Sequence, residues 1–584
     1  MSTRRGDRAR APAPCGGGLR VSWCPTLRTS SSSALTAPFE LQLLDHRGPV
    51  RPNFQSSARS RAPGRRLAGR SVRAVEDVRP SRDSRRPRRS PSGKGNDASM
   101  QLATDATTQS SRGRATTSSM IAIALIAAMS GLLFGYDTGI IATALPGISD
   151  SYHLVSESDK QIITSALLLG AVFSAPFTSY LCDRFGRKPM LLLIAALFIV
   201  STVICAIRTT PTVLTAARFF LGLAIGAASG AAPIYISEMS PAERRGRLVV
   251  LFQLMIMIGI VCAHFTGYFI GHQAWQWLIG FGALPAVVML VGVTLLPESP
   301  RWLYAHGMVE KAQAVLLRLR GDRELVEREL GGMAEALADE RQANAGTWRE
   351  FFSARVRPAV VLGGGVAMFS QITGNNALVY YMPTVFHDLG FSEDASVLMP
   401  AFGAVGVMVM TLVGSHLVDI VGRRKYLLVM VPISILSFIV IALLLGQGSD
   451  ATQGWQLYAI FGAVILYMVA NNGAFGVTIW LINAEVYPMK LRGKGGAFGA
   501  FSHWFFDFII AATTLTLFQV LGAAGPFWLF TGISVVSLAF VYFLLPETKG
   551  KSLEQIEHEL NQGRFYQFQR RGRRPVESST DTAG

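Results

Sequence analysis

Two charged side chains interrupt long apolar runs of this sequence and have the chemistry to carry a proton through a membrane. Asp137 lies in the segment GLLFGYDTG at residues 131–139, and Arg218 is the only other strong charge at a comparable depth. An ionisable side chain inside a membrane segment is a functional candidate that needs a named partner. Burial and a nearby guanidinium act in opposite directions on the proton affinity of a carboxyl, so a conformational change can load and release a proton. We predict a proton-coupling pair, with a static buried ion pair as the alternative.

A second segment carries amides of the kind that bind a polyhydroxyl ring. It reads FSQITGNNALVYYMP and covers residues 369–383. Amide side chains both donate and accept hydrogen bonds, as sugar hydroxyls require. Buried amides also hold membrane helices together, so a structural role stays open.

These residues lie in a chain whose composition is typical of a membrane protein. Of its 584 residues, 50% are hydrophobic and only 16% are charged, against roughly a quarter in soluble domains. Apolar runs of about 20 residues recur, long enough to cross a hydrocarbon core of roughly 30 Å. The first six lie near 120–146, 161–182, 189–208, 212–236, 248–271 and 275–296, and six more lie near 358–386, 395–418, 426–446, 456–484, 495–521 and 526–545. We predict an all-α polytopic membrane protein of twelve transmembrane helices.

The charges of the connecting segments predict the orientation. DRFGRK at 183–188 and GRRK at 422–425 are basic, whereas SDSYHLVSESDK at 149–160 is acidic. Basic loops face the cytoplasm, so both termini and the central interval are expected there. Counted from the cytoplasmic ends, Asp137 and Arg218 rise about 25 and 30 Å, and can therefore meet.

Three motifs occur twice in the same order, which predicts two parallel repeats of six helices. Asp183–Lys188 recurs as Asp419–Arg424, Glu238–Pro241 as Glu485–Pro488, and Pro297–Ser299 as Pro546–Thr548. Duplicated halves of this kind place a substrate site between them at the bilayer midplane and alternate access by rocking.

From about Ser118 to Glu557 the chain resembles the sugar porter family of the major facilitator superfamily, which includes bacterial xylose, galactose and inositol–proton symporters. The resemblance rests on GRK and GRR after the second and eighth spans, on PESPR at 297–301 and on PETKG at 546–550. It implies the major facilitator fold and transport of a monosaccharide or polyol. In proton-coupled members an Asp in the FGYD motif pairs with an Arg on the fourth span, which matches Asp137 and Arg218.

The same resemblance implies a substrate site and a cytoplasmic gate. In this sequence Ser370 replaces a family Gln, Asn375 replaces an apolar residue, His503 replaces a Gln or Asn, and Asp507 replaces a neutral amide. Asp507 either lines the cavity or pairs with His503 one turn earlier. The implied substrate contacts are Gln253, Gln371, Asn376, Gly476, Trp480, His503 and Trp504, and the implied gate residues are Asp183, Arg184, Arg187, Glu238, Arg245, Asp419, Arg423, Glu485 and Arg492. Plain topology and helix-dipole anchoring are the alternative for the gate residues.

Most of the positive charge lies in the N-terminal tail. Residues 1–119 carry 23 Lys and Arg against 8 Asp and Glu, so +15 of the formal net charge of +17 lies there. The body is therefore nearly neutral, and no nucleic-acid partner is expected. The tail cannot bury enough surface to order itself, so we predict disorder. Its 22 Arg against the single Lys94 favour a true start at Met100 or Met120, with a lipid-bound basic tail as the alternative.

The remaining expectations concern organisation and function. Five cysteines show no metal-ligand spacing, so no metal and no cofactor are expected. We predict a proton-coupled transporter of a monosaccharide or polyol, not an enzyme, acting as a monomer among the lipids of the cell membrane. A facilitative uniporter and a non-transporting sugar sensor are the alternatives. The predicted parts are the tail 1–119, helix bundles 120–297 and 358–546, linker helices 298–357 and a C-terminal tail 547–584.

Overall fold

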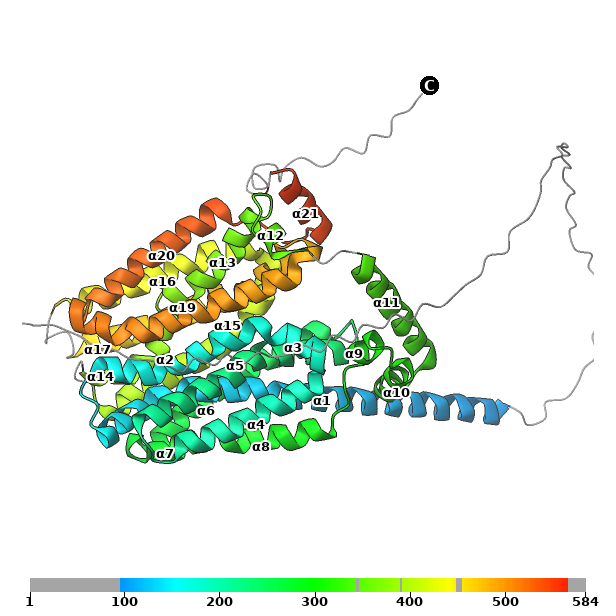
Figure 1. Ribbon diagram of the computed structural model, residues 1–584, viewed down its shortest axis with the longest axis horizontal. Coiled ribbons are helices and arrows are strands. Elements are labelled where there is room, and N and C mark those ends of the chain that lie inside the picture. Colours follow the sequence, from blue (N-terminus) through cyan, green and yellow to red (C-terminus); the bar gives the residue numbers. More distant parts are fainter. Residues whose placement is uncertain (1–94, 343–345, 389–390, 448–453, 564, 566–584) are drawn as a thin grey trace, which may run out of the picture. The chain divides into compact units, whose positions relative to one another are not determined.

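A computed structural model describes residues 95–342, 346–388, 391–447, 454–563 and 565, and these form helices joined by short connections (Figure 1). The first bundle contains α1 (Gly95–Tyr152), α2 (Glu157–Ser174), η1 (Ala175–Phe177), α3 (Thr178–Phe185), α4 (Arg187–Ala206), α5 (Pro211–Met239), α6 (Arg245–Ile270), η2 (His272–Ala274), α7 (Trp275–Gly280) and α8 (Ala283–Leu295). The linker contains α9 (Pro300–Ala305), α10 (Val309–Arg320), α11 (Arg323–Gln342) and α12 (Trp348–Phe351).

The second bundle contains α13 (Arg357–Ile372), α14 (Asn375–Asp388), α15 (Glu393–Val421), α16 (Arg423–Leu445), α17 (Trp455–Asn471), the π-turn η4 (Asn472–Gly476), α18 (Val477–Glu485), η5 (Met489–Leu491), α19 (Arg492–Leu521) and α20 (Gly525–Leu544), followed by α21 (Leu553–Asn561). Within the described residues, 11 helical runs are long and apolar enough to cross a membrane. They coincide with all the predicted spans but the seventh, so the predicted all-α architecture is confirmed.

The predicted seventh span is two shorter helices, α13 and α14, that meet at Gly374. This glycine has a φ of +94°, and a Cβ added to it would lie 2.7 Å from Cγ of the Phe530 ring. A broken helix leaves backbone groups that must find partners inside the membrane. The hydroxyl of Tyr467 donates to the carbonyl of Thr373 at 2.7 Å. Sequence periodicity shows hydrophobicity and not backbone breaks, so it did not predict this interruption.

The N-terminal part of α1 differs from the prediction of disorder up to residue 119. Residues 95–119 continue the first span as helix, whereas residues 1–94 lie outside the described part of the chain. Extending an existing helix adds one hydrogen bond per residue fixed, which is much easier than nucleating a helix. The prediction neglected the span that lies directly after this segment.

Within the first bundle, small residues bring helices close together. A Cβ on Gly135 of α1 would lie 1.9 Å from the carbonyl oxygen of Ile256 on α6, and a Cβ on Gly222 of α5 would lie 1.8 Å from that of Leu167 on α2. Close backbone approach at small residues is typical of membrane helices. It fixes α1 against α6 and α5 against α2.

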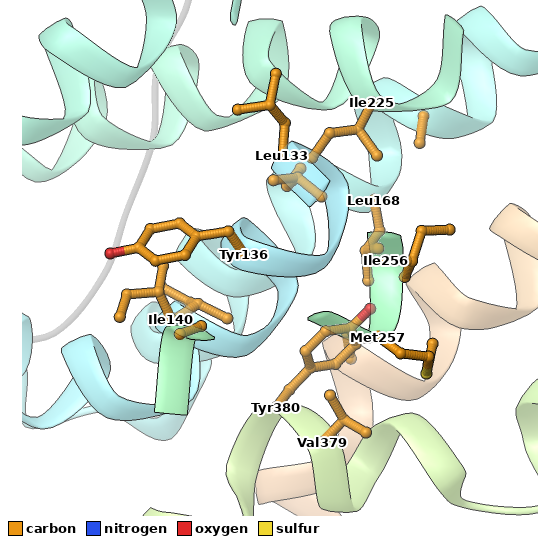
Figure 2. Close-up of a cluster of buried hydrophobic side chains, with 14 of the residues drawn as sticks. Leu133, Tyr136, Ile140, Leu168, Ile225, Ile256, Met257, Val379 and Tyr380 are labelled. Atoms are coloured by element: carbon orange, nitrogen blue, oxygen red, sulfur yellow. The ribbon is translucent and has the colours of Figure 1, made fainter. Parts of the chain in front are cut away.

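The two bundles contact each other through α2 with α19, α6 with α15, and α1 with α14, and η1 also contacts α19. Gln161 of α2 donates to Thr516 of α19 at 2.8 Å, and the rings of Phe134 and Trp504 lie 5.3 Å apart. Figure 2 shows Tyr380 of α14 in the same buried cluster as Met257 of α6. Because α14 also contacts α19, helices α1, α14 and α19 meet between the bundles.

The connection between α3 and α4 depends on a glycine, which gives a stability prediction. Gly186 has a φ of +100°, and a Cβ there would lie 2.4 Å from Oε2 of Glu298. Non-glycine residues in such conformations cost about 1–3 kcal/mol. We expect Gly186→Ala to lower the free energy of unfolding in detergent by at least that amount. Gly246→Ala is the control, because Gly246 lies on α6 with open space around it. This variant should not lower the free energy of unfolding. Equal stability of the two variants would contradict this reading.

Candidate functional site

Asp137 on α1 and Arg218 on α5 face each other in the interior of the first bundle. Nη2 of Arg218 lies 3.5 Å from Oδ2 of Asp137, and the two side chains are 2% and 5% exposed, respectively. Nε of Arg218 also donates to the carbonyl of Ile163 on α2 at 2.9 Å. The guanidinium is therefore held by backbone, whereas the carboxylate faces it at the limit of hydrogen-bond distance. The structure brings together the two residues that the sequence paired.

Three of the predicted substrate contacts form one hydrogen-bonded group. Nδ2 of Asn376 donates to Oε1 of Gln371 at 2.7 Å, and Nε2 of Gln371 lies 2.8 Å from Nδ1 of His503. Gln371 lies in the last turn of α13, Asn376 in the first turn of α14, and His503 on α19. The break at Gly374 therefore places two amides of one span beside the imidazole of another.

The group extends to the tenth span through Asn375, which stands where the family usually has an apolar residue. Nδ2 of Asn375 donates to Oδ1 of Asn376 at 2.8 Å, and Nδ2 of Asn472 donates to Oδ1 of Asn375 at 2.6 Å. Asn472 opens the π-turn η4, and it also donates to the carbonyl of Met468 at 3.0 Å. We call Gln371, Asn376, Asn375 and Asn472 the amide chain.

Asp507 joins the other side of this group. Its Oδ1 accepts from Nδ2 of Asn376 at 2.7 Å, and its Oδ2 accepts from the hydroxyl of Tyr380 at 3.2 Å. The expected alternative, a pair between Asp507 and His503, is not formed among the described residues; Nδ1 of His503 contacts Gln371 instead. Tyr380 was missed, since aromatic residues in an apolar span give no signal of their own.

The predicted aromatic contacts surround His503. The rings of Trp480 and Trp504 lie 5.4 and 5.3 Å from it. Trp480 is 42% exposed and Trp504 only 1%, so Trp480 is the more accessible of the two rings. Gly476 ends the π-turn one helical turn before Trp480. Gln253 is half-buried on α6, and within the described residues it makes no hydrogen bond to this group.

The charged motifs of the first bundle form a compact network around Arg187. Its Nε lies 2.8 Å from Oε2 of Glu238, and its Nη2 lies 2.8 Å from Oδ1 of Asp183. Oε2 of Glu238 also accepts from the hydroxyl of Ser299 at 2.6 Å. This network joins the ends of α3, α4 and α5 to the start of α9.

The second bundle repeats this arrangement with the matching residues. Arg423 lies 2.9 Å from Glu485 and 3.1 Å from Asp419, and the hydroxyl of Thr548 donates to Glu485 at 2.6 Å. The duplicated motifs therefore build duplicated networks. The ion pairs of each network stay within its own bundle.

Two glutamates of the PESPR and PETKG motifs were missed as functional residues. Glu298 accepts from the backbone N–H groups of Arg187 at 3.0 Å and Lys188 at 3.1 Å, and Glu547 accepts from that of Arg423 at 2.9 Å. Each carboxylate thus satisfies free N–H groups at a helix N-terminus. Burial raises the pKa of Glu298, and the backbone N–H groups oppose that shift. The repeated Pro-Glu-Ser/Thr motif was the sequence feature that could have identified these two glutamates.

Three predicted gate residues form no ion pair within the described residues. Arg184 is exposed and donates to the hydroxyl of Tyr180 at 3.2 Å. Arg245 is exposed at the start of α6. Nε and Nη2 of Arg492 are buried with no hydrogen-bond partner among the described groups. Their part in a gate stays a prediction.

Two repeated helix bundles around a buried polar site define a secondary membrane transporter. The family model described as "Sugar (and other) transporter" matches residues 123–560. The chain is 34% identical over 446 residues to the arabinose-proton symporter of Escherichia coli, covering 76% of this chain and 93% of that one. It is 34% identical over 445 residues to the major myo-inositol transporter of Bacillus subtilis, covering 74% and 93%.

The fold also matches the inward-open xylose transporter of Escherichia coli, with a TM-score of 0.65, 24% identity and coverage of 75% of this chain and 99% of that one. The chain belongs to the sugar transporter family of the major facilitator superfamily, and it is a multi-pass membrane protein.

The two acidic partners of Arg187 provide a matched test of burial. The side chain of Glu238 is 9% exposed and that of Asp183 is 69% exposed. Breaking a buried pair costs about 3–5 kcal/mol, whereas an exposed pair contributes about 0–1 kcal/mol. We expect Glu238→Gln to lower the free energy of unfolding in detergent by about 3 kcal/mol, and Asp183→Asn by less than about 1 kcal/mol. Losses of equal size would show that burial does not govern this network.

Proposed function

We propose that this protein takes up a monosaccharide or polyol together with a proton by alternating access. The observation that carries the proposal is the buried pair of Asp137 and Arg218 in a transporter whose other bundle holds a group of amides. A proton acceptor and a set of hydroxyl partners are the two elements that sugar–proton symport requires. The named activities of the arabinose-proton symporter and the myo-inositol transporter support it.

The amide chain supports the substrate class. Gln371 and Asn376 each present both a donor and an acceptor, which matches a sugar hydroxyl. Trp480 provides an exposed ring next to His503. We propose that Gln371, Asn376, Trp480 and His503 contact the sugar, with Gln253 joining from the first bundle as the halves close.

The ion pair supports the coupled ion. At the centre of a membrane a carboxylate is stable beside a cation or after it takes up a proton. Protonation of Asp137 removes its attraction to Arg218, which is anchored separately to the α2 backbone. We propose that this change frees α1 from α5, so that the two helices shift against each other during transport.

The cytoplasmic networks support a rocking motion. Within the described residues, the ion pairs of Arg187 and Arg423 stay within residues 120–297 and 358–546, respectively. We propose that they hold the cytoplasmic end of each bundle together as one body, so that the gate opens between bundles. Both the proton pair and the amide chain lie in one chain, so a monomer suffices for transport. Transport without chemical conversion of the sugar is part of the proposal.

A facilitative uniporter of the same substrates is the second candidate. It is disfavoured by Asp137, because a uniporter has no use for a titratable carboxyl beside a buried arginine. The two candidates differ in whether sugar can accumulate against its gradient.

Removal of the amides should weaken sugar binding. An unpaired buried polar group costs about 1–3 kcal/mol, so Gln371→Ala and Asn376→Ala should each raise the Kd roughly 5- to 150-fold. Binding would be measured by calorimetry on purified protein. Ser437→Ala is the control, because that buried hydroxyl donates only to the carbonyl of Ile433 in its own helix. Unchanged affinity in both amide variants would remove them from the site.

Substitution of Asp137 should separate accumulation from binding. A proton moving down roughly 100 mV releases about 2.3 kcal/mol, which supports roughly 40-fold accumulation. Asp137→Asn keeps the shape but cannot titrate. We expect this variant to lose gradient-driven accumulation in proteoliposomes, while it still binds sugar and exchanges it at equal concentrations.

Glu157→Gln, at the start of α2, is the matched control and should accumulate sugar like the wild type. Accumulation at the wild-type level by Asp137→Asn, abolished by an uncoupler, would show that another group carries the proton.

A further inference from the structure

Asp507 is a buried acid to which the pairing of Asp137 with Arg218 assigns no role. Its side chain is buried, at 2% exposure, and both oxygens accept hydrogen bonds, from Asn376 and Tyr380. No basic side chain lies within 4.0 Å of it among the described residues, and Arg218 is already committed to Asp137 and a backbone carbonyl. A buried carboxylate without a cation is strongly disfavoured unless it takes up a proton.

The amide chain has a fixed direction that begins at a backbone carbonyl. The carbonyl of Met468 only accepts, so the amide group that faces it must be Nδ2 of Asn472. That leaves the second hydrogen on Nδ2 for Oδ1 of Asn375. Nδ2 of Asn375 then donates to Oδ1 of Asn376. Every amide orientation in the chain follows from this one contact.

The fixed direction determines what reaches the two ends of the chain. Nδ2 of Asn376 donates one hydrogen to Oε1 of Gln371 and the other to Oδ1 of Asp507. Nε2 of Gln371 then donates its two hydrogens to Oγ of Ser370 and to Nδ1 of His503. His503 is therefore held as the tautomer that carries its hydrogen on Nε2. Asp507 is held as an acceptor at Oδ1.

The second oxygen of Asp507 can carry a proton without disturbing this order. Its partner is the hydroxyl of Tyr380, which can donate to a carboxylate or accept from a carboxylic acid. Protonation at Oδ2 thus keeps both hydrogen bonds in place. A proton adds almost no volume at Asp507. An ammonium group of a substrate would instead need space beside this enclosed side chain.

We propose that Asp507 is a second proton-binding residue of the transport cycle, and that sugar binding draws a proton to it through Asn376. The inference rests on the proposed function, because it takes Asn376 as a sugar contact. A sugar hydroxyl that accepts from Nδ2 of Asn376 removes that donor from the Asp507 carboxylate. A hydrogen bond to the charged form stabilises that form, so its loss favours protonation. By reciprocity, protonation of Asp507 tightens sugar binding.

The titratable groups around Asp507 come from three helices. The hydroxyl of Tyr380 on α14 donates to Asp507, and the hydroxyl of the neighbouring Tyr381 donates to the carbonyl of Ala511, one turn later on α19. His503 lies one turn earlier on α19 with its Nδ1 occupied. Asp137 of α1 is paired with Arg218. Asp507 is the member of this set whose charge no arginine or lysine offsets.

The test counts protons taken up as sugar binds to the purified full-length protein. Calorimetric titrations in buffers of different ionisation enthalpy would use the tightest-binding member of a panel of D-xylose, L-arabinose, D-galactose and myo-inositol. The starting variant is Asp137→Asn, which removes the first proton site. We expect it to take up as much as about one proton per sugar. Adding Asp507→Asn should abolish the uptake while sugar still binds, and adding Asp159→Asn, an exposed acid on α2, should leave it intact.

Equal proton uptake with and without Asp507, or no uptake by Asp137→Asn at any pH where sugar binds, would overturn the inference. If Asp507→Asn does not bind sugar, Tyr380→Phe replaces it. Loss of that hydroxyl should move the midpoint of uptake to higher pH by about half a unit or more, and an unmoved midpoint overturns the inference. Absence of sugar binding by the wild-type protein would overturn the proposed function and, with it, this inference.

Discussion

A charge inside a membrane needs an opposite charge or a proton, and the pair of Asp137 and Arg218 meets this constraint in the first bundle. The two groups lie 3.5 Å apart and almost fully buried. Because Arg218 is also bonded to the α2 backbone, one ionic contact joins α1 to both α5 and α2. We propose that removing the charge of Asp137 alters the packing of these three helices. A proton can therefore act on the conformation of the bundle as well as on its charge.

The second bundle meets a related constraint with neutral groups. The break of the seventh span at Gly374 leaves backbone groups without partners in their own helix. It also brings the side chains of Gln371 and Asn376 into hydrogen-bond contact. Tyr467 satisfies the freed carbonyl of Thr373, and the amide chain connects the break to the π-turn of the tenth span and to α19. On the proposed function, a sugar that replaced one of these hydrogen bonds would act on three spans together. The first bundle thus holds an ionic site and the second a hydrogen-bonding site, and α1 of the first bundle contacts α14 of the second.

Much of this arrangement could be predicted from the sequence, because it depends on hydrophobicity and on repeated motifs. The lengths of the apolar runs predicted the spans, and the isolation of Asp137 and Arg218 predicted their pairing. The helix at 95–119, the break at Gly374 and the capping by Glu298 were not predicted. A break depends on one residue with positive φ, and a cap depends on a carboxylate that approaches the backbone from 111 residues away. Asp507 was noticed as unusual, but its partners depend on amide orientations that only the folded chain determines.

Symport requires that sugar and proton cross the membrane together. This coupling can be measured with purified protein in liposomes that have no initial pH gradient and are loaded with a pH-sensitive dye, when sugar is added outside. Sugar entering down its own gradient should carry protons inward and acidify the lumen, and the signal should disappear with an uncoupler. Sugar entry at a comparable rate without acidification would contradict the account and identify the protein as a uniporter.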